Sequence, residues 1–144
     1  MGSSISSKAL IEWNEALTID QGLIDRDHKH LFSLTDQLYS AIKLGFPKAG
    51  IETLLNDYIE FIALHFSHEE MLMESIRYPD IERHVLAHNV FFEKVCNLRT
   101  QYKRNDKDIA GPISAYIGTY TFNHIDIYDR KLAEYCQSMP RSAG

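Results

Sequence analysis

Seven side chains of this sequence combine the types and spacings that metal ions use as ligands. His65 and Glu69 form an HxxxE pair, and His84 and His88 form an HxxxH pair. Residues four apart lie one turn apart on the same face of an α-helix, so each pair delivers two donors to one place. Buried imidazoles and carboxylates need a metal or a hydrogen-bond network to satisfy them. The seven candidate metal ligands are His28, His65, Glu69, His84, His88, His124 and Asp129.

The pair His124 and Asp129 departs from this spacing, because its members are five residues apart. Five residues turn a regular helix about 140° beyond the first side chain. Two alternatives remain open. Asp129 could reach sideways, as a carboxylate that bridges to a second metal would, or the helix is locally distorted there.

The donor set indicates which metal the chain would hold, and how many ions. Five imidazoles and two carboxylates without a thiolate argue against structural zinc and favour iron or manganese. Seven protein ligands are too many for one ion, so we expect two. Two six-coordinate ions offer about twelve positions. Five imidazoles, two bridging carboxylates and one oxo or hydroxo bridge from solvent fill all but one of them.

An open position on a redox-active pair of ions is what O2 binding requires. Bundle di-iron enzymes typically use four glutamates and two histidines, and such anionic ligands support oxygen activation. A histidine-rich site favours an adduct from which oxygen can leave again. The sequence therefore predicts reversible O2 binding, with slow oxidase chemistry as an alternative.

Four helices are expected to carry these ligands. Hydrophobic residues recur at steps of three and four in four segments, which is typical of one buried helix face. Runs of glycine, proline or polar residues separate the four segments. We predict helices over residues 22–44, 51–76, 81–102 and 109–137. Four helices with short connections predict an all-α fold, an antiparallel up-down-up-down four-helix bundle. The inward stripe of the fourth helix is expected to hold Ile113, Ile117, Tyr120, His124, Ile127 and Tyr128.

The remaining segments are expected to lie outside the helices. Residues 1–7 and 138–144 are rich in small and polar residues and are interpreted as flexible ends. Residues 8–137 form one domain, and within it residues 8–21, which hold the only tryptophan, Trp13, are expected to cross the bundle in extended form.

Composition narrows the class of protein. With 144 residues and a net charge of −5 the chain has no basic patch, which argues against nucleic acid and anionic membranes as partners. It contains no apolar run long enough to span a membrane and no signal-peptide core, so we expect a cytoplasmic protein. Cys96 and Cys136 lie far apart in sequence and are interpreted as reduced thiols that pack in the interior.

Two further histidines provide a contrast with the candidate ligands. His30 lies two residues from His28 and therefore faces away from it, and His68 lies about 100° from Glu69 around the helix. We expect both to be solvated or to lie outside the ligand set, although His68 could substitute in a rearranged site.

The candidate ligands, in this order, resemble the hemerythrin family in its bacterial single-domain form. The likeness spans about residues 13–131, and the ordered set of seven is far more specific than any one pair. Besides the seven ligands, the residues that carry it are Trp13, Ile24, Asp25, Lys29, Leu31, Phe32, Phe66, Glu70, Met73 and Ile125.

The resemblance implies a non-haem di-iron site that binds O2 reversibly. By the family pattern, His84, His88 and His124 hold one iron, His28 and His65 hold the iron with the open position, and Glu69 and Asp129 bridge the two.

Residues next to the ligands are expected to form the O2 pocket. Leu31, Phe66 and Phe91 flank ligands and would wall the cavity, with plain core packing as the alternative. The family usually carries Trp-Leu where this chain has Tyr120-Thr121, and the leucine lines the pocket. The Thr121 hydroxyl would either bond back to a helix carbonyl or make the pocket polar, so that it admits water or donates to the ligand.

Three acidic residues near the ligands are open to interpretation. Asp27 stands where the family commonly has glutamine, and we expect it at the surface or outside the ligand set, with little importance. Asp25 and Glu70 could orient imidazoles, or they could be solvated charges.

The resemblance leaves several roles open for one kind of site. The protein could carry, store or sense O2, with azide or NO as other small ligands. It could be the sensory input module of a larger signalling protein, which would add a signalling domain as partner. It could also be an oxidase, a peroxidase or an NO-handling enzyme, or it could store iron.

Overall fold

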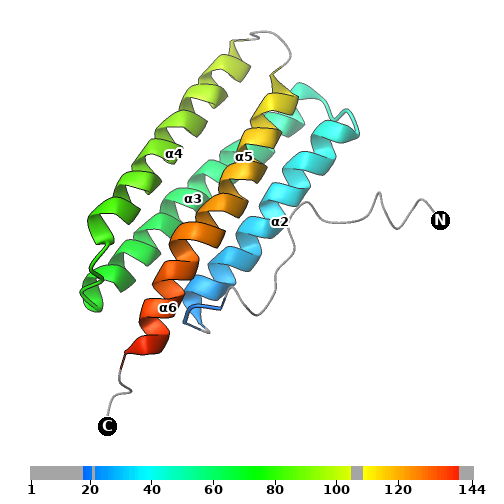
Figure 1. Ribbon diagram of the computed structural model, residues 1–144. Helices are drawn as coiled ribbons and strands as arrows, with labels where there is room; N and C mark the ends of the chain where they lie inside the picture. Colours follow the sequence, from blue (N-terminus) through cyan, green and yellow to red (C-terminus); the bar gives the residue numbers. More distant parts are fainter. Residues whose placement is uncertain (1–17, 21, 105–108, 140–144) are drawn as a thin grey trace, which may run out of the picture.

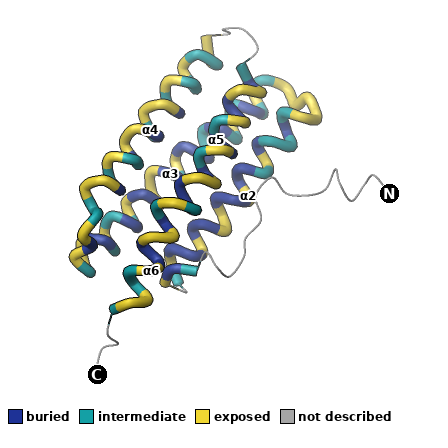
Figure 2. The backbone as a smooth tube through the Cα atoms, viewed as in Figure 1, coloured by how far each residue is buried: buried dark blue, intermediate teal, exposed yellow. Residues whose placement is uncertain are grey.

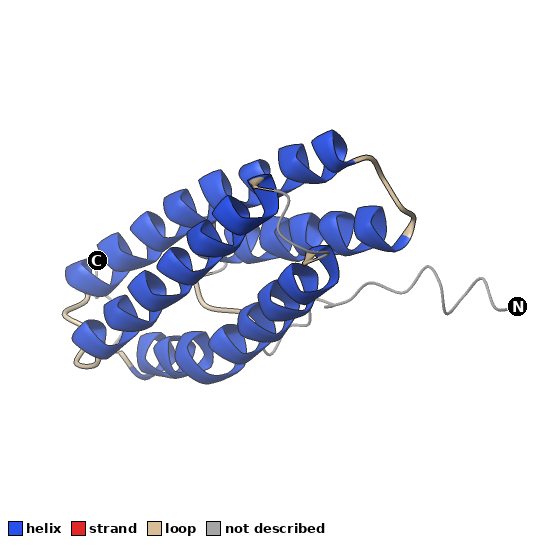
Figure 3. Ribbon diagram, turned by 90° about the horizontal axis from the view of Figure 1, so that it is seen from above, coloured by secondary structure: helices blue, strands red, loops and turns tan. Residues whose placement is uncertain are grey.

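Four antiparallel helical rods make up the computed structural model, which describes residues 18–20, 22–104 and 109–139. Along the chain the direction alternates from rod to rod, and the last rod is built from α5 and α6 (Figure 1). The view from above shows helices and connecting loops in the described ranges, with no strand (Figure 3). The all-α prediction and the four-helix bundle are therefore confirmed. The elements are α2 (Leu23–Lys43), α3 (Lys48–Ser75), α4 (Ile81–Lys103), α5 (Ala110–His124), the π-helical turn η2 (Ile125–Asp129) and α6 (Arg130–Ser138).

The start of α3 differs from the prediction. The helix begins at Lys48 and not at residue 51, because Pro47, with φ −57°, stands directly before it. Proline fits the start of a helix, since its missing N–H would find no partner there and its φ is already helical. The break between α2 and α3 is therefore short, and Gly45 makes it with a φ of +77°, a conformation that glycine adopts without strain.

The buried residues lie on the helix faces that turn towards the inside of the bundle (Figure 2). They form two separate apolar clusters, a larger one that contains Leu31, Ile62, Phe91 and Ile117 and a smaller one that contains Ile24, Met73, Tyr78 and Leu132. Along each rod the candidate ligands lie between residues of one cluster and residues of the other. The polar centre is therefore sealed by apolar layers on both sides.

Several predictions concern residues outside the described ranges. Trp13 and the predicted flexible end at residues 1–7 lie there, as does most of the tail at 138–144, so the predicted domain bounds stay predictions. Of the predicted extended segment, Thr18, Ile19 and Asp20 are described, and they are not helical. Cys96 and Cys136 are free and half-buried. None of the described helices is long and apolar enough to cross a membrane.

Candidate metal centre

All seven candidate ligands meet in the middle of the bundle, and each is at most 4% exposed. Their donor atoms fall into two groups, within each of which the atoms lie within 4.8 Å of one another. One group draws on α3, α4 and α5, and the other on α2, α3 and η2. The first group is Glu69, His84, His88 and His124, and the second is His28, His65, Glu69 and Asp129.

Glu69 belongs to both groups because its two carboxylate oxygens face opposite ways. Oε1 lies 3.1 Å from Nε2 of His84 and 3.0 Å from Nε2 of His88. Oε2 lies 3.0 Å from Nε2 of His28 and 3.1 Å from Nε2 of His65. One carboxylate therefore presents one oxygen to each cluster of imidazoles.

Asp129 also spans the two groups. Its Oδ1 lies 3.1 Å from Nε2 of His84 and 3.2 Å from Nε2 of His124, while its Oδ2 lies 3.1 Å from Nε2 of His28. Both oxygens are fully buried, and despite these short contacts neither accepts a hydrogen bond of acceptable angle from the described residues.

These distances and angles fit ligands that converge on metal ions. Metal bonds of about 2.1 Å to imidazole nitrogen and carboxylate oxygen place neighbouring ligand atoms about 3 Å apart. A buried carboxylate without a well-aligned donor is costly unless a cation satisfies it. The residues present therefore fit a pair of cations that share Glu69 and Asp129.

Burial and charge act against each other on the protonation of this cluster. Burial by itself would lower the pKa of His28, but the nearby charges of Asp129 and Glu69 and the hydrogen bond to Glu69 raise it to about 10. Burial likewise opposes the rise in the pKa of His84, which those two carboxylates bring to about 9. The carboxyl pKa values of Glu69 and Asp129 lie well below their usual range despite burial, because the histidines outweigh it. The raised pKa values of His28 and His84 favour protonated imidazoles in the metal-free cluster, so a metal that binds there would compete with protons.

A π-helical turn explains the five-residue spacing of His124 and Asp129. The turn η2 covers Ile125–Asp129, directly after the histidine. Backbone bonds in a π-helix join residues five apart, so residues at that spacing lie one turn apart. For His124 and Asp129 the structure therefore supports the second alternative, a helix that is locally distorted.

The same turn corrects the predicted stripe of the fourth helix. Ile127 is 58% exposed and does not point inward, whereas Ile125 and Leu132 are buried. The extra residue in the turn shifts the inward face by one position. A strict three-four periodicity cannot anticipate such a shift.

Three of the imidazoles are held at their second nitrogen. Nδ1 of His65 donates to Asp27 Oδ2 at 3.0 Å, and Nδ1 of His88 donates to Glu70 Oε2 at 2.9 Å. A carboxylate only accepts, so the proton lies on Nδ1 and Nε2 is free to bind a metal. Of the two interpretations of Glu70, the structure supports the one in which it orients an imidazole.

His124 is held through a chain of two bonds. Its Nδ1 lies 3.0 Å from the hydroxyl of Tyr120, and that hydroxyl donates to the carbonyl oxygen of Ala87 at 3.2 Å. Because the phenol proton is committed to the carbonyl, the phenol oxygen accepts from Nδ1. His124 is thereby fixed in the same tautomer as His65 and His88.

Of the two places expected for Asp27, at the surface or just outside the ligand set, the structure has the second, and only the little importance given to it is corrected. It is 5% exposed and accepts bonds from two histidines, His65 and, at 2.7 Å, His68. His68 therefore lies behind a ligand and not in the ligand set. Asp25 accepts a 2.8 Å bond from the backbone N–H of Ile19, and His30 packs edge-on against Phe61.

A small cavity of about 10 Å³ lies directly beside the centre. Its volume is about that needed for one water-sized molecule. Leu31, Phe66 and Thr121, which the sequence predicts around the O2 pocket, line this cavity. Phe91 does not line it, but stacks on Tyr120 behind it at a ring distance of 3.5 Å. The other lining residues are Ile62, His65, Tyr120, His124, Ile125 and Asp129.

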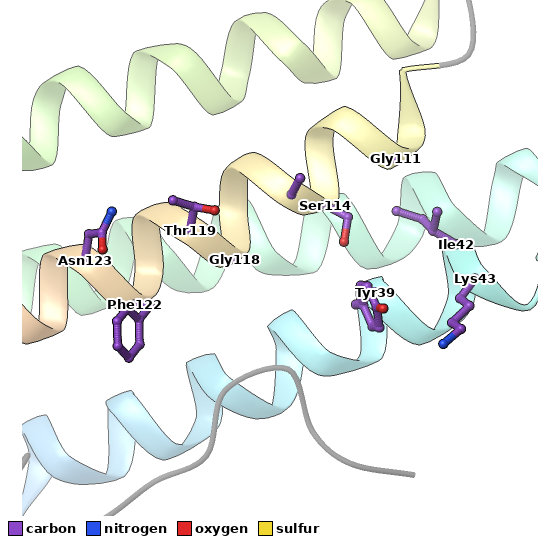
Figure 4. A pocket seen from close by; sticks show the side chains of 10 residues that line it. Tyr39, Ile42, Lys43, Gly111, Ser114, Gly118, Thr119, Phe122 and Asn123 are labelled. Carbon is purple, nitrogen blue, oxygen red and sulfur yellow. The ribbon is translucent and has the colours of Figure 1, made fainter. Parts of the chain in front are cut away.

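A much larger groove, of about 640 Å³, lies between α2 and α5 and is lined by residues such as Tyr39, Ser114, Gly118 and Phe122 (Figure 4). None of the seven candidate ligands lines it. Three of the seven, His65, His124 and Asp129, line the small cavity instead.

Comparisons with known proteins agree with the site. The family model described as the hemerythrin HHE cation binding domain matches residues 21–136. A bacteriohemerythrin of Stenotrophomonas maltophilia is 27% identical over 126 residues, which cover 88% of this chain and 81% of the relative. A bacteriohemerythrin of Methylococcus capsulatus is 23% identical over 123 residues, covering 85% and 93%. A crystal structure of wild-type hemerythrin has the same fold, with a TM-score of 0.80 at 22% identity over 91% of this chain and 100% of that one.

Proposed function

The chain belongs to the hemerythrin family, and from that premise we propose that it binds O2 reversibly at a non-haem di-iron centre. His84, His88 and His124 would hold one iron and His28 and His65 the other, with Glu69 and Asp129 shared between them. The observation that carries the proposal is the division of Glu69, whose two oxygens face two clusters with unequal numbers of imidazoles. The cluster with fewer imidazoles would keep a position for an external ligand.

Two ferrous ions would supply the electrons that O2 takes up on binding and would recover them on its release. The protein contributes the surroundings. Leu31, Ile62 and Phe66 present an apolar wall that excludes bulk water, and Asp27, Glu70 and Tyr120 fix the orientation of three imidazoles.

The size of the cavity favours binding over turnover. A space of about 10 Å³ beside the ligands suits a diatomic or triatomic molecule such as O2, NO or azide, and it is too small for an organic substrate. We therefore propose an oxygen carrier, store or sensor and not an oxidase. The free cysteines suit a reducing compartment, and we propose the cytoplasm.

Iron analysis with absorption spectroscopy tests this function. The protein would be loaded with iron, reduced without oxygen, exposed to air and then purged with argon. The expected result is two irons per chain and a charge-transfer band that appears in air and disappears under argon. Variable iron content would favour storage, and a band that decays with consumption of added reductant would favour an enzyme. Either outcome would contradict the proposal.

A further inference from the structure

Two buried hydroxyl groups meet beside the small cavity. The phenol oxygen of Tyr58, on α3, lies 3.1 Å from Oγ1 of Thr121, on α5. Tyr58 is 0% exposed and Thr121 is 4% exposed, so neither is hydrated by bulk water. Thr121 lines the cavity together with His65 and Asp129.

Each of the two hydroxyls carries one proton, and the hydrogen bond that joins them uses one of these protons. A phenol is a much stronger acid than an aliphatic alcohol, so Tyr58 is the better donor and Thr121 the acceptor. The proton that remains is therefore that of Thr121. It has to find an acceptor elsewhere.

The usual acceptor for a helical threonine is the carbonyl one turn earlier. Thr53 and Thr100 both make that bond, to Ala49 and Cys96 at 3.0 and 3.1 Å. Within the described residues Thr121 makes no such bond, and Tyr58 is the partner that it has. The phenol of Tyr58 therefore takes the place of the helix carbonyl as the partner of the threonine oxygen.

The other groups around the cavity do not compete for the role of donor. Tyr120 lines the cavity, but its proton is committed to the carbonyl of Ala87. Nδ1 of His65 and Nδ1 of His124 are bonded to Asp27 and Tyr120, and the Asp129 carboxylate only accepts. The remaining lining residues, Leu31, Ile62, Phe66 and Ile125, have no polar side-chain atoms. The Thr121 hydroxyl is therefore the donor that the described lining residues leave for a ligand in the cavity.

We infer that Tyr58 is a positioning residue, which holds Thr121 so that its hydroxyl donates a hydrogen bond to a small ligand in the cavity. The inference rests on the proposed function and adds a ligand class to it. Ligands with a negatively charged acceptor atom are favoured, with azide as the test case. Neutral ligands that accept hydrogen bonds poorly, such as NO, gain little.

Azide titration of the oxidised, iron-loaded protein tests the inference, with NO binding to the reduced protein as the comparison. Tyr58→Phe releases the threonine to its own helix, and Thr121→Val removes the donor, so each should weaken azide binding about tenfold. The double variant should also lose about tenfold, since both changes remove one bond, while Thr121→Ser should stay close to wild type. NO affinity should change by less than about twofold. Thr100→Val, which removes an exposed hydroxyl on α4, is the matched control.

A second readout requires no iron. Urea unfolding of the metal-free single and double variants should show coupling between Tyr58 and Thr121, with the double variant less destabilised than the sum of the singles. Additive destabilisation by the two single changes would contradict a hydrogen bond between Tyr58 and Thr121. Azide affinity unchanged in Tyr58→Phe, or azide and NO weakened equally, would overturn the donor role. A wild-type protein that holds fewer than two irons would contradict the proposed function. The urea measurement on the metal-free variants would then still test the hydrogen bond between Tyr58 and Thr121.

Discussion

The two halves of the candidate metal centre share Glu69 and differ by one imidazole. The half built from α4 and α5 gathers three histidines, His84, His88 and His124, whereas the half built from α2 and α3 gathers His28 and His65. The cavity for a small ligand is lined by one imidazole from each half, His65 and His124. One bundle can therefore make two unlike sites that share a carboxylate, because one pair of helices supplies three imidazoles and the other pair two.

Removing the shared carboxylate should have the largest effect, because it acts on both halves at once. In Glu69→Ala, and in the more conservative Glu69→Gln, we expect the iron content to fall from two per chain to nearly none, because each oxygen serves one group. Iron analysis after a desalting column measures this, with circular dichroism as a check of folding. Glu74→Ala, an exposed acidic position on the same helix, is the control. If one iron remained tightly bound, the two halves would be independent sites and not a pair.

Removing one imidazole from each half should separate the two sites. His65→Ala should lose one iron and all O2 binding, and it should keep the other iron within the three-histidine half. His88→Ala should also lose O2 binding. In this variant each half of the site has only two imidazoles, so the three-histidine half no longer exists. We therefore expect a chelator wash that leaves about one iron in His65→Ala to strip His88→Ala. An unchanged oxy spectrum in His65→Ala would refute the assignment of the open position.

The hydrophobic periodicity of the sequence predicts the inward face of a single helix better than it predicts the contacts between helices. His84 and His88 lie inward on regular α4, as the four-residue spacing predicts. The five-residue spacing of His124 and Asp129 signals an irregularity, but a hydrophobic pattern cannot distinguish a sideways carboxylate from the π-turn that the structure has. Ile127 is assigned to the wrong face for the same reason.

The sequence gives weaker signals for the contacts between helices. Asp27 lies one residue before a ligand on α2, and its partners His65 and His68 lie on α3. Tyr58 fits the inward stripe of α3, yet its bond to Thr121 depends on how α3 packs against α5. The resemblance to the family marks these two positions, because by its pattern Asp27 stands in place of a glutamine and Thr121 in place of a leucine. Their partners follow only from the packing.

The smallest expected effect comes from the carboxylates that hold the second nitrogens. Asp27, behind the two-histidine half, has a side chain 7% exposed, whereas Glu70, behind the three-histidine half, is 34% exposed. Burial alone would raise the pKa of Asp27, but its bonds to His65 and His68 lower it, so a buried charge faces His65. Asp27→Asn keeps the shape and removes this charge.

We therefore expect Asp27→Asn to weaken iron binding about tenfold, and Glu70→Gln to weaken it less, because water screens the more exposed pair. Competition with a chromogenic chelator at pH 7 measures both. Asp27 also stabilises the metal-free fold above the ordinary aspartate pKa of 3.8, and this contribution is lost as pH falls through its lowered folded value. Asp27→Asn should accordingly flatten the acid side of the metal-free stability profile. Equal losses of iron in the two variants would mean that burial does not distinguish the halves, and that the number of imidazoles alone makes them unlike.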